Sequence, residues 1–263
     1  NNTMRKLDIL VLSDLHLGTY GSHAEELLSY LRSVEVDTII LNGDIVDIWQ
    51  FKKRYFPEPH FQVLKEFISK ICSGTKVYYL TGNHDDLLRK ISPIQIANFQ
   101  LIDKLVMNID GKKVWFFHGD VFDSLVNHSK FIAKLGGKGY DLLIRINRVI
   151  NRMLKAMGKQ PYSFSKKVKS SVKKAAKHIS DFETTAADLA ISNGYKYVVC
   201  GHIHEPIIKE LNSEGESVIY MNSGDWVESL TSLEYANGEW KIYNHFEEQD
   251  LTEEKILQEL EAL

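Results

Sequence analysis

Five short blocks of the sequence place aspartate, asparagine and histidine close together, and each block follows an apolar run. They are Asp14-Leu15-His16, Gly43-Asp44 with Asp47, Gly82-Asn83-His84-Asp85, His118-Gly119-Asp120 and Gly201-His202-Ile203-His204. Carboxylate and amide oxygens together with imidazole nitrogens suit divalent ions such as Mn²⁺, Fe²⁺ or Zn²⁺. No cysteine belongs to any block, which disfavours a thiolate zinc site. The residue types therefore predict a site for divalent cations.

The spacing within the blocks supports a common site. In Asp14-x-His16 and His202-x-His204, residues two apart in an extended stretch point the same way, so each pair can reach one ion. Glycine permits tight turns and a close approach of the backbone to a metal. Glycines stand beside four candidates, Asp44, Asn83, His118 and His202.

The elements that must position these blocks are short buried strands. Six apolar runs are too short and too continuous for exposed helices: Leu7–Leu12, Thr38–Leu41, Lys76–Leu80, Val114–Phe117, Tyr197–Cys200 and Val218–Met221. Helical patterns over residues 24–34 and 61–71 separate the first three runs. This alternation predicts a sheet covered by helices. Because functional residues gather at the carboxyl ends of such strands, five strand ends are expected to converge on one edge.

The middle and the end of the chain have different patterns. Ser129–His178 contains fourteen Lys or Arg and a single acid, Asp141, which predicts an inserted basic helical hairpin between two strands. Its second helix is expected over about residues 165–191. Residues 217–235 and 239–246 are expected to form β-meander strands with a type I′ turn at Asn237-Gly238. The last residues, 251–263, have the pattern of an amphipathic helix.

The composition limits the class of protein. Hydrophobic residues make up 44% of the chain and charged residues 25%, the range of an ordinary globular protein. The formal net charge of −3 gives no global argument for nucleic acid or membrane binding. Only two cysteines, Cys72 and Cys200, are present, which favours a reducing compartment. The start has no long apolar run of a signal peptide, and we expect a cytoplasmic protein.

In their order from Asp14 to His204, the five blocks resemble the motifs of the calcineurin-like metallophosphoesterases. The resemblance implies an α/β fold, a layered β-sandwich flanked by helices with the helical hairpin inserted as a cap. It implies a single domain over residues 1–263, with the cap at about 124–192. It also implies a metal-dependent hydrolase of phosphoric esters or anhydrides with two divalent ions, among which Mn²⁺ is favoured over Fe²⁺ or Zn²⁺.

The resemblance also assigns roles to individual residues. Asp14, His16 and His204 would hold one ion, Asn83, His118 and His202 the second, and Asp44 would bridge the two. Such ions, about 3.5–4 Å apart, can share a hydroxide and clamp a phosphoryl group for in-line attack. His84 would face the scissile phosphate, to stabilise charge or to protonate the leaving oxygen. Asp47 and Asp85 would orient a histidine.

Within that superfamily the chain resembles the UDP-2,3-diacylglucosamine hydrolases of lipid A synthesis and their paralogues. The likeness lies in residues 13–18, 43–49, 118–120 and 222–226 and in the insertion before Gly201. It implies cleavage of the pyrophosphate of a UDP-linked acylated sugar near the inner membrane, with Arg145, Arg148 and Arg152 of the basic cap contacting substrate. Those hydrolases usually carry arginine where His84 stands. A phosphodiesterase or phosphomonoesterase for another nucleotide or phosphoester therefore remains the alternative.

The basic hairpin admits other interpretations. A run of charge is commonly a solvated helix face, yet like charges at i,i+4 spacing destabilise a helix, so a polyanionic substrate or an anionic lipid surface is an alternative. A nuclease subunit would use it for nucleic acid, but its aromatic residues for base stacking are few, and we expect no nucleic-acid partner. An adaptor without turnover is disfavoured because no ligand position is substituted.

Overall fold

The computed structural model describes residues 4–48, 55–124, 172–213 and 215–250. The α-helices are α1 (Ala24–Ser33), α2 (Glu58–Cys72) and α6 (Val172–Ser192), and short 3₁₀ turns cover η2 (Asp86–Lys90) and η3 (Asp120–Ser124). The strands are β1 (Arg5–Leu12), β2 (Val34–Asn42), β3 (Lys76–Leu80), β4 (Ile94–Ile96), β5 (Phe99–Ile102), β6 (Lys104–Ile109), β7 (Lys112–Phe117), β8 (Tyr197–Cys200), β9 (Ile207–Ser213), β10 (Glu216–Asn222), β11 (Thr231–Ala236) and β12 (Glu239–Asn244).

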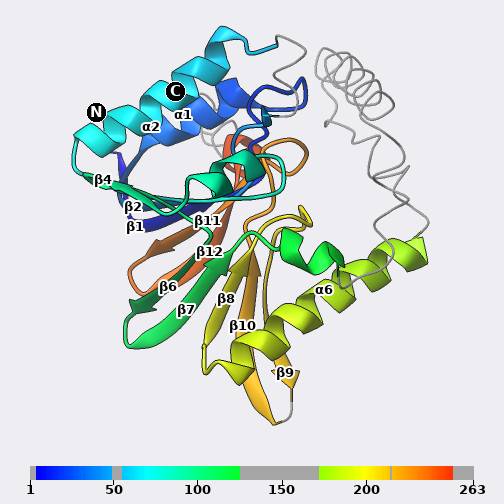
Figure 1. Cartoon of the computed structure of the whole chain (residues 1–263). Helices are drawn as coiled ribbons and strands as arrows, with labels where there is room; N and C mark the ends of the chain where they lie inside the picture. The colour runs from blue at the N-terminus through cyan, green and yellow to red at the C-terminus, as the bar shows by residue number, and fades with distance from the viewer. Residues whose placement is uncertain (1–3, 49–54, 125–171, 214, 251–263) are drawn as a thin grey trace, which may run out of the picture.

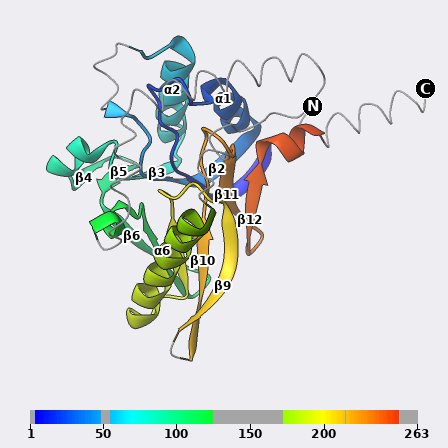
Figure 2. The same cartoon turned by 90° about the vertical axis from the view of Figure 1, so that its right-hand side faces the viewer.

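The strands form two sheets that pack face to face. The first sheet has seven strands in the order β12-β11-β1-β2-β3-β5-β4, and the second has five in the order β6-β7-β8-β10-β9. Helices α1 and α2 lie side by side over the outer face of the first sheet, and α6 lies along the outer face of the second (Figures 1 and 2). The expected α/β sandwich flanked by helices is confirmed.

A separate apolar core holds each pair of layers together. Under α1 and α2, side chains such as Leu27 and Val63 pack on Leu10 of β1. Between the sheets lie Ile9, Val11, Ile40 and Leu80 of the first sheet and Val114, Phe116, Val199 and Met221 of the second. Under α6, Phe182 and three alanines pack against β8 and β10. The central strands are thus buried on both faces, which is why their sequences read as continuous apolar runs.

The expected meander near the end of the chain is wrong in one respect. Strand β10 belongs to the second sheet, where it pairs with β8 in parallel and with β9 in antiparallel, whereas β11 pairs with β1 in the first sheet. The turn at Asn237-Gly238 is confirmed, since β11 and β12 pair across it and both residues have positive φ. The chain therefore crosses between the sheets over residues 223–230.

The predicted basic insertion separates two neighbouring strands. Strands β7 and β8 pair in parallel, so a crossover segment must connect them. Helix α6 is the second predicted helix of the insertion, and the described part of it covers Val172–Ser192. The first predicted helix lies outside the described residues, as does the predicted helix over 251–263. Among the described helices, none is long and apolar enough to cross a bilayer.

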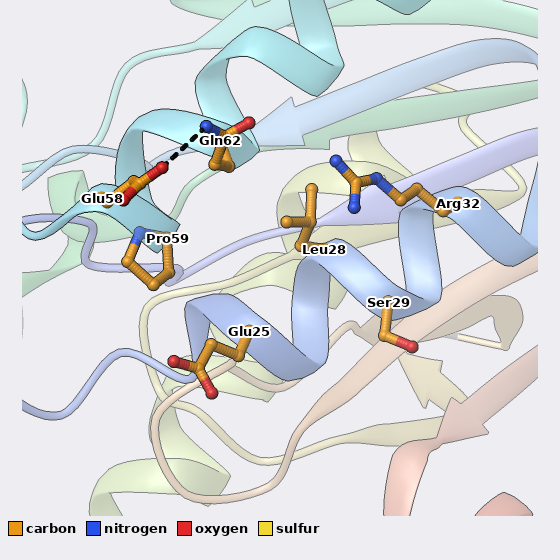
Figure 3. A pocket seen from close by; sticks show the side chains of 7 residues that line it. All are labelled: Glu25, Leu28, Ser29, Arg32, Glu58, Pro59 and Gln62. Carbon is orange, nitrogen blue, oxygen red and sulfur yellow. Dashed lines mark hydrogen bonds between the residues drawn. The ribbon is translucent and has the colours of Figure 1, made fainter.

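A shallow hollow of about 460 Å³ opens between α1 and α2 on the outer face of the first sheet (Figure 3). Leu28 and Pro59 form part of its wall, and Glu25, Glu58 and Arg32 stand at its edge. No residue of the five sequence blocks lines it. The chemistry predicted from the sequence must therefore lie elsewhere.

A buried carboxylate secures the outer strands of the first sheet to α1. Glu234 of β11 is only 8% exposed and accepts two hydrogen bonds from the Arg5 guanidinium, each at 2.9 Å. The Tyr30 hydroxyl donates a third at 2.7 Å. Bidentate pairing with arginine is among the strongest side-chain interactions, and here it satisfies a charge that burial would otherwise penalise.

Replacing Glu234 by alanine is expected to lower the free energy of unfolding by about 2–4 kcal/mol, because Arg5 and the buried Tyr30 hydroxyl lose their acceptor. Urea denaturation followed by circular dichroism measures the change. Glu239→Ala is the control, since Glu239 forms an exposed ion pair with Lys241 and should shift stability by less than about 0.5 kcal/mol. Equal shifts in the two variants would contradict the role of Glu234.

Candidate metal centre

The five sequence blocks meet where the carboxyl ends of five strands come together. Three of these strands, β1, β2 and β3, are parallel neighbours in the first sheet, and β7 and β8 are parallel neighbours in the second. The convergence is therefore at the junction of two sheets, not at the edge of one as the sequence suggested. Asn42 spans this junction, because its side-chain amide donates to the carbonyls of Phe117 at 3.1 Å and Val199 at 3.4 Å.

The backbone of the candidate ligands is held in an unusual conformation. Asp14, His16, Asp44, His202 and His204 have φ between 46° and 65°, in the left-handed region. Residues other than glycine seldom adopt this region, and doing so costs roughly 1–2 kcal/mol each. Such strain concentrates at functional sites, where the surrounding structure enforces it. Here the ordered loops turn each polar side chain back toward the junction.

Two glycines allow the loops to approach one another. A Cβ on Gly82 would lie 2.2 Å from Asp44 Oδ1, and a Cβ on Gly43 would lie 2.4 Å from the His118 ring. Gly43 also has φ +87°. Larger residues would force the candidate ligands apart, so glycine at these two positions is a steric requirement of the centre.

The first group of candidate ligands contains Asp14, His16 and His204. Their potential ligand atoms lie within 4.8 Å of one another. His204 Nε2 is 3.0 Å and His16 Nε2 is 3.7 Å from Asp14 Oδ1. The other oxygen, Oδ2, accepts the backbone N–H of His202 at 3.0 Å, so Asp14 links the ends of β1 and β8.

The second group contains Asp44, His118 and His202, also with ligand atoms within 4.8 Å of one another. His118 is buried, and its Nδ1 donates to the Asn42 carbonyl at 2.9 Å. A carbonyl can only accept, so Nδ1 carries a proton. Nε2 points toward Asp44 Oδ2 at 3.3 Å. Nε2 is therefore the nitrogen of His118 through which a metal would bind.

Asp44 lies between the two groups. Its Oδ2 is 3.3 Å from His118 Nε2 in the second group and 3.9 Å from His16 Nε2 in the first. Its Oδ1 accepts the backbone N–H of His84 at 2.8 Å. A carboxylate that faces both sets of imidazoles is placed where a bridging ligand is needed.

Three buried polar atoms of the candidate metal centre have no hydrogen-bond partner in the described part of the chain: Asp14 Oδ1, Asn83 Oδ1 and His118 Nε2. Leaving such an atom unsatisfied costs about 1–3 kcal/mol, so buried polar atoms normally find a partner. His204 Nε2 approaches Asp14 Oδ1 without hydrogen-bond geometry, as two ligands of one cation would. The donor set therefore fits divalent cations.

The electrostatics of the centre lead to the same requirement. Burial of the His118 ring lowers its pKa, but attraction by Asp44 and Asp14 outweighs burial and raises the pKa to about 10. Burial likewise lowers the pKa of His204, and Asp14 and Asp225 raise it to about 10. The buried carboxylates thus hold protons on imidazoles that would otherwise be neutral, which means that the centre demands positive charge.

His84 and Asp47 form a pair at the open side of the centre. His84 Nδ1 is 2.9 Å from Asp47 Oδ2, and the His84 side chain is 30% exposed. Asp47 Oδ2 also lies 3.8 Å from His16 Nδ1. Burial raises the pKa of Asp47, whereas His16 and His84 lower it to about 2. Asp47 thus lies within 4 Å of two histidines, His84 and His16.

Asp85 has a different position from the one predicted. Its carboxylate accepts the backbone N–H groups of Gly82 at 2.6 Å and Ile45 at 2.9 Å, and the Tyr79 hydroxyl at 2.6 Å. These contacts join the loops after β2 and β3, and no contact of Asp85 with a histidine occurs among the described residues. The expectation that Asp85 orients a histidine is therefore wrong, because its side chain turns back toward the loop that carries it.

Two further contacts of the centre were not assigned from the sequence. Arg89 forms a bidentate pair with Asp120 at 2.8 and 2.9 Å, which ties the loop after β3 to the loop after β7. Asp225, fully buried in the crossing between the sheets, lies 3.2 Å from His204 Nδ1. Residues 222–226 are part of the resemblance to the UDP-2,3-diacylglucosamine hydrolases, but the sequence gives no indication that Asp225 contacts His204. Arg145, Arg148 and Arg152 lie outside the described residues.

Comparison with known proteins agrees with this geometry. Residues 7–206 match the family described as calcineurin-like phosphoesterase. A UDP-2,3-diacylglucosamine hydrolase of Aliivibrio fischeri is 25% identical over 248 residues, 90% of this chain and 97% of the relative. Another protein of that name, from Stenotrophomonas maltophilia, is 23% identical over 89% of this chain and 96% of its own length.

Among solved structures, an archaeal phosphodiesterase has 16% identity and a TM-score of 0.43, covering 90% of this chain and 98% of its own. A phosphoesterase from E. coli has 13% identity and a TM-score of 0.44, covering 87% of this chain and 88% of its own. The family match spans most of the chain and all five blocks. The chain therefore belongs to the calcineurin-like phosphoesterase family, and it is an enzyme that hydrolyses phosphoesters.

Proposed function

We propose that this enzyme cleaves the pyrophosphate of a UDP-linked acylated sugar of the UDP-2,3-diacylglucosamine type. The observation that carries the proposal is the pair of ligand groups at the junction of the sheets, with Asp44 between them. The substrate class rests on relatives that are named for this activity and align with about nine-tenths of the chain. Water would add to one phosphorus, and the P–O bond to the other phosphate would break, releasing UMP and an acylated sugar phosphate.

Members of the family use two divalent ions, and the proposed ligands divide into two sets. Asp14, His16 and His204 would hold one ion, Asn83, His118 and His202 the other, and Asp44 both. Because the donors are hard oxygens and imidazole nitrogens, Mn²⁺ is the favoured ion, with Fe²⁺ and Zn²⁺ as alternatives. When bound, such ions activate water and neutralise charge on the phosphoryl group.

His84 has the proposed role of contacting the scissile phosphate. Asp47 accepts from Nδ1 of His84 at 2.9 Å, so the opposite ring nitrogen, Nε2, is the one proposed to contact the substrate. The leaving group of a pyrophosphate is a phosphate, which needs little protonation, so with this substrate His84 would mainly stabilise developing charge. With an alkoxide leaving group the same nitrogen would have to donate a proton.

The position of His84 also supports a second candidate function. The hydrolases of UDP-2,3-diacylglucosamine usually carry an arginine there, whose guanidinium forks onto a phosphate. Histidine offers a single donor that can transfer its proton. This favours a phosphodiesterase or phosphomonoesterase acting on another nucleotide or phosphoester. In either case we propose a cytoplasmic enzyme with one domain that includes the basic cap, which for a lipid-linked substrate would contact the anionic surface of the inner membrane.

A panel of substrates distinguishes these functions. Mn²⁺-loaded enzyme is expected to turn over UDP-2,3-diacylglucosamine with a kcat/KM at least about tenfold above that for bis-p-nitrophenyl phosphate or nucleoside monophosphates, equivalent to roughly 1.4 kcal/mol. UMP release is followed by chromatography, and UDP-glucosamine without acyl chains is the control. If the lipid nucleotide is the poorest substrate, the proposed substrate is wrong, while phosphoester hydrolysis stands.

Asp44→Asn is expected to lower turnover by more than about 100-fold and to reduce the bound metal, because one charge and one bridging oxygen are lost. Metal per chain is measured by mass spectrometry after gel filtration, alongside turnover. Asp37→Asn is the matched control, since Asp37 is an exposed aspartate on β2, the strand that precedes the Asp44 loop. Wild-type turnover and metal content in Asp44→Asn would refute the bridging role.

His84→Ala is expected to lower the rate of ester hydrolysis more strongly the more basic the leaving group is. The loss should be about 10²-fold or more for an alkyl ester and much less for p-nitrophenyl esters. Rates for a series of phosphodiesters give the slope for each variant, with His23→Ala, at the residue before α1, as the control. Metal content should not change. A uniform loss across the series would argue against proton donation by His84 and for binding or charge stabilisation alone.

A further inference from the structure

Hydrogen bonds fix the crossing between the two sheets, residues 223–230, to Ser13 and Asp14 after β1. Ser223 Oγ and Ser13 Oγ share a hydrogen bond of 2.8 Å, and Ser13 Oγ donates to the Gly224 carbonyl at 3.0 Å. The backbone N–H of Trp226 donates to the carbonyl of Asp14 at 3.2 Å. Asp225 stands between these anchors, so its position relative to β1 is determined on both sides.

The Asp225 carboxylate is fully buried, and its two oxygens have different tasks. Oδ1 accepts the backbone N–H groups of Val227 at 2.8 Å, Glu228 at 2.5 Å and Ser229 at 3.0 Å. These amides lock the orientation of the carboxylate. Oδ2 faces His204 Nδ1 at 3.2 Å and the Ser229 hydroxyl at 3.4 Å.

This contact decides which nitrogen of His204 faces the centre. A carboxylate can only accept, so Oδ2 of Asp225, 3.2 Å away, favours a proton on Nδ1. The opposite nitrogen, Nε2, lies on the side of Asp14, 3.0 Å from Oδ1, and is the atom that would bind an ion. An orienting carboxylate behind a ligating imidazole fixes the tautomer and the ring plane and makes the imidazole a better donor.

We propose that Asp225 is a positioning residue for the candidate metal centre, which holds His204 with Nε2 directed at the ion it shares with Asp14 and His16. This inference rests on the proposed role of His204 as a metal ligand. It adds to the five sequence blocks a supporting carboxylate from the crossing between the sheets. The amides of residues 227–229 hold that carboxylate in turn.

The test is Asp225→Asn. The amide oxygen can keep the contacts to residues 227–229, but its NH₂ group would donate to His204 Nδ1 and drive the ring proton onto Nε2. Mn²⁺ binding, measured by titration calorimetry without substrate, is expected to weaken about 10- to 100-fold for one of the two ions. An unchanged affinity for both ions in a folded variant would overturn the inference.

A double-mutant cycle with His204→Ala separates the proposed role from damage to the loop. If Asp225 acts through His204, Asp225→Asn should change Mn²⁺ affinity by less than about twofold when His204 is already alanine. An equal loss in both backgrounds would overturn the inference. Should His204→Ala bind both ions like the wild type, the proposed ligand itself would be wrong, which is a distinct result.

A measurement on the wild-type protein needs no variant. In the Zn²⁺-loaded protein, ¹⁵N chemical shifts of the His204 ring are expected to show a protonated Nδ1 and a metal-bound Nε2. Metal on Nδ1 and a proton on Nε2 would overturn the inference, whatever the stability of Asp225→Asn.

Discussion

The structure depends on one electrostatic constraint, the burial of two carboxylates side by side where the sheets meet. Asp14 and Asp44 are almost fully inaccessible, and an isolated buried carboxylate would be prohibitively unfavourable. Burial alone would lower the pKa of His16, but Asp14, Asp47 and Asp44 raise it to about 10. Positive charge must therefore reside in the centre, either as protons on imidazoles or as divalent cations that replace them.

Satisfying that constraint determines the local backbone. Five proposed ligands adopt left-handed φ values, which strands and helices do not use, so each ligand must stand in a loop just beyond a strand. The strands make this strain tolerable because they are anchored in apolar cores on both faces. Other carboxylates connect the loops instead. Asp85 accepts the backbone N–H groups of Gly82 and Ile45, so its oxygens are directed at the backbone and not at the candidate metal centre.

The sequence predicts what is local and misses what is tertiary. Runs such as Lys76–Leu80 and Tyr197–Cys200 were placed to the residue, because strands buried on both faces leave an unbroken apolar pattern. Strand β6 leaves no such signal, because its exposed residues, among them Lys104 and Asn108, alternate with half-buried ones. Burial patterns also say nothing about which sheet a strand joins, so the sequence predicts β10 and β11 as neighbours although they lie in different sheets. The pairing of Asp225 with His204 arises only from that crossing between sheets.

The junction also couples metal binding to folding. The first proposed ligand set takes Asp14 and His16 from the first sheet and His204 from the second, and the other set is divided in the same way. Neither set is complete within one sheet, so an ion held by both sheets binds only the packed sandwich and stabilises it by its binding free energy. Asn42 joins the same sheets through Phe117 and Val199, directly beneath the centre. Correct packing of the sandwich and correct spacing of the ligands are therefore a single structural requirement.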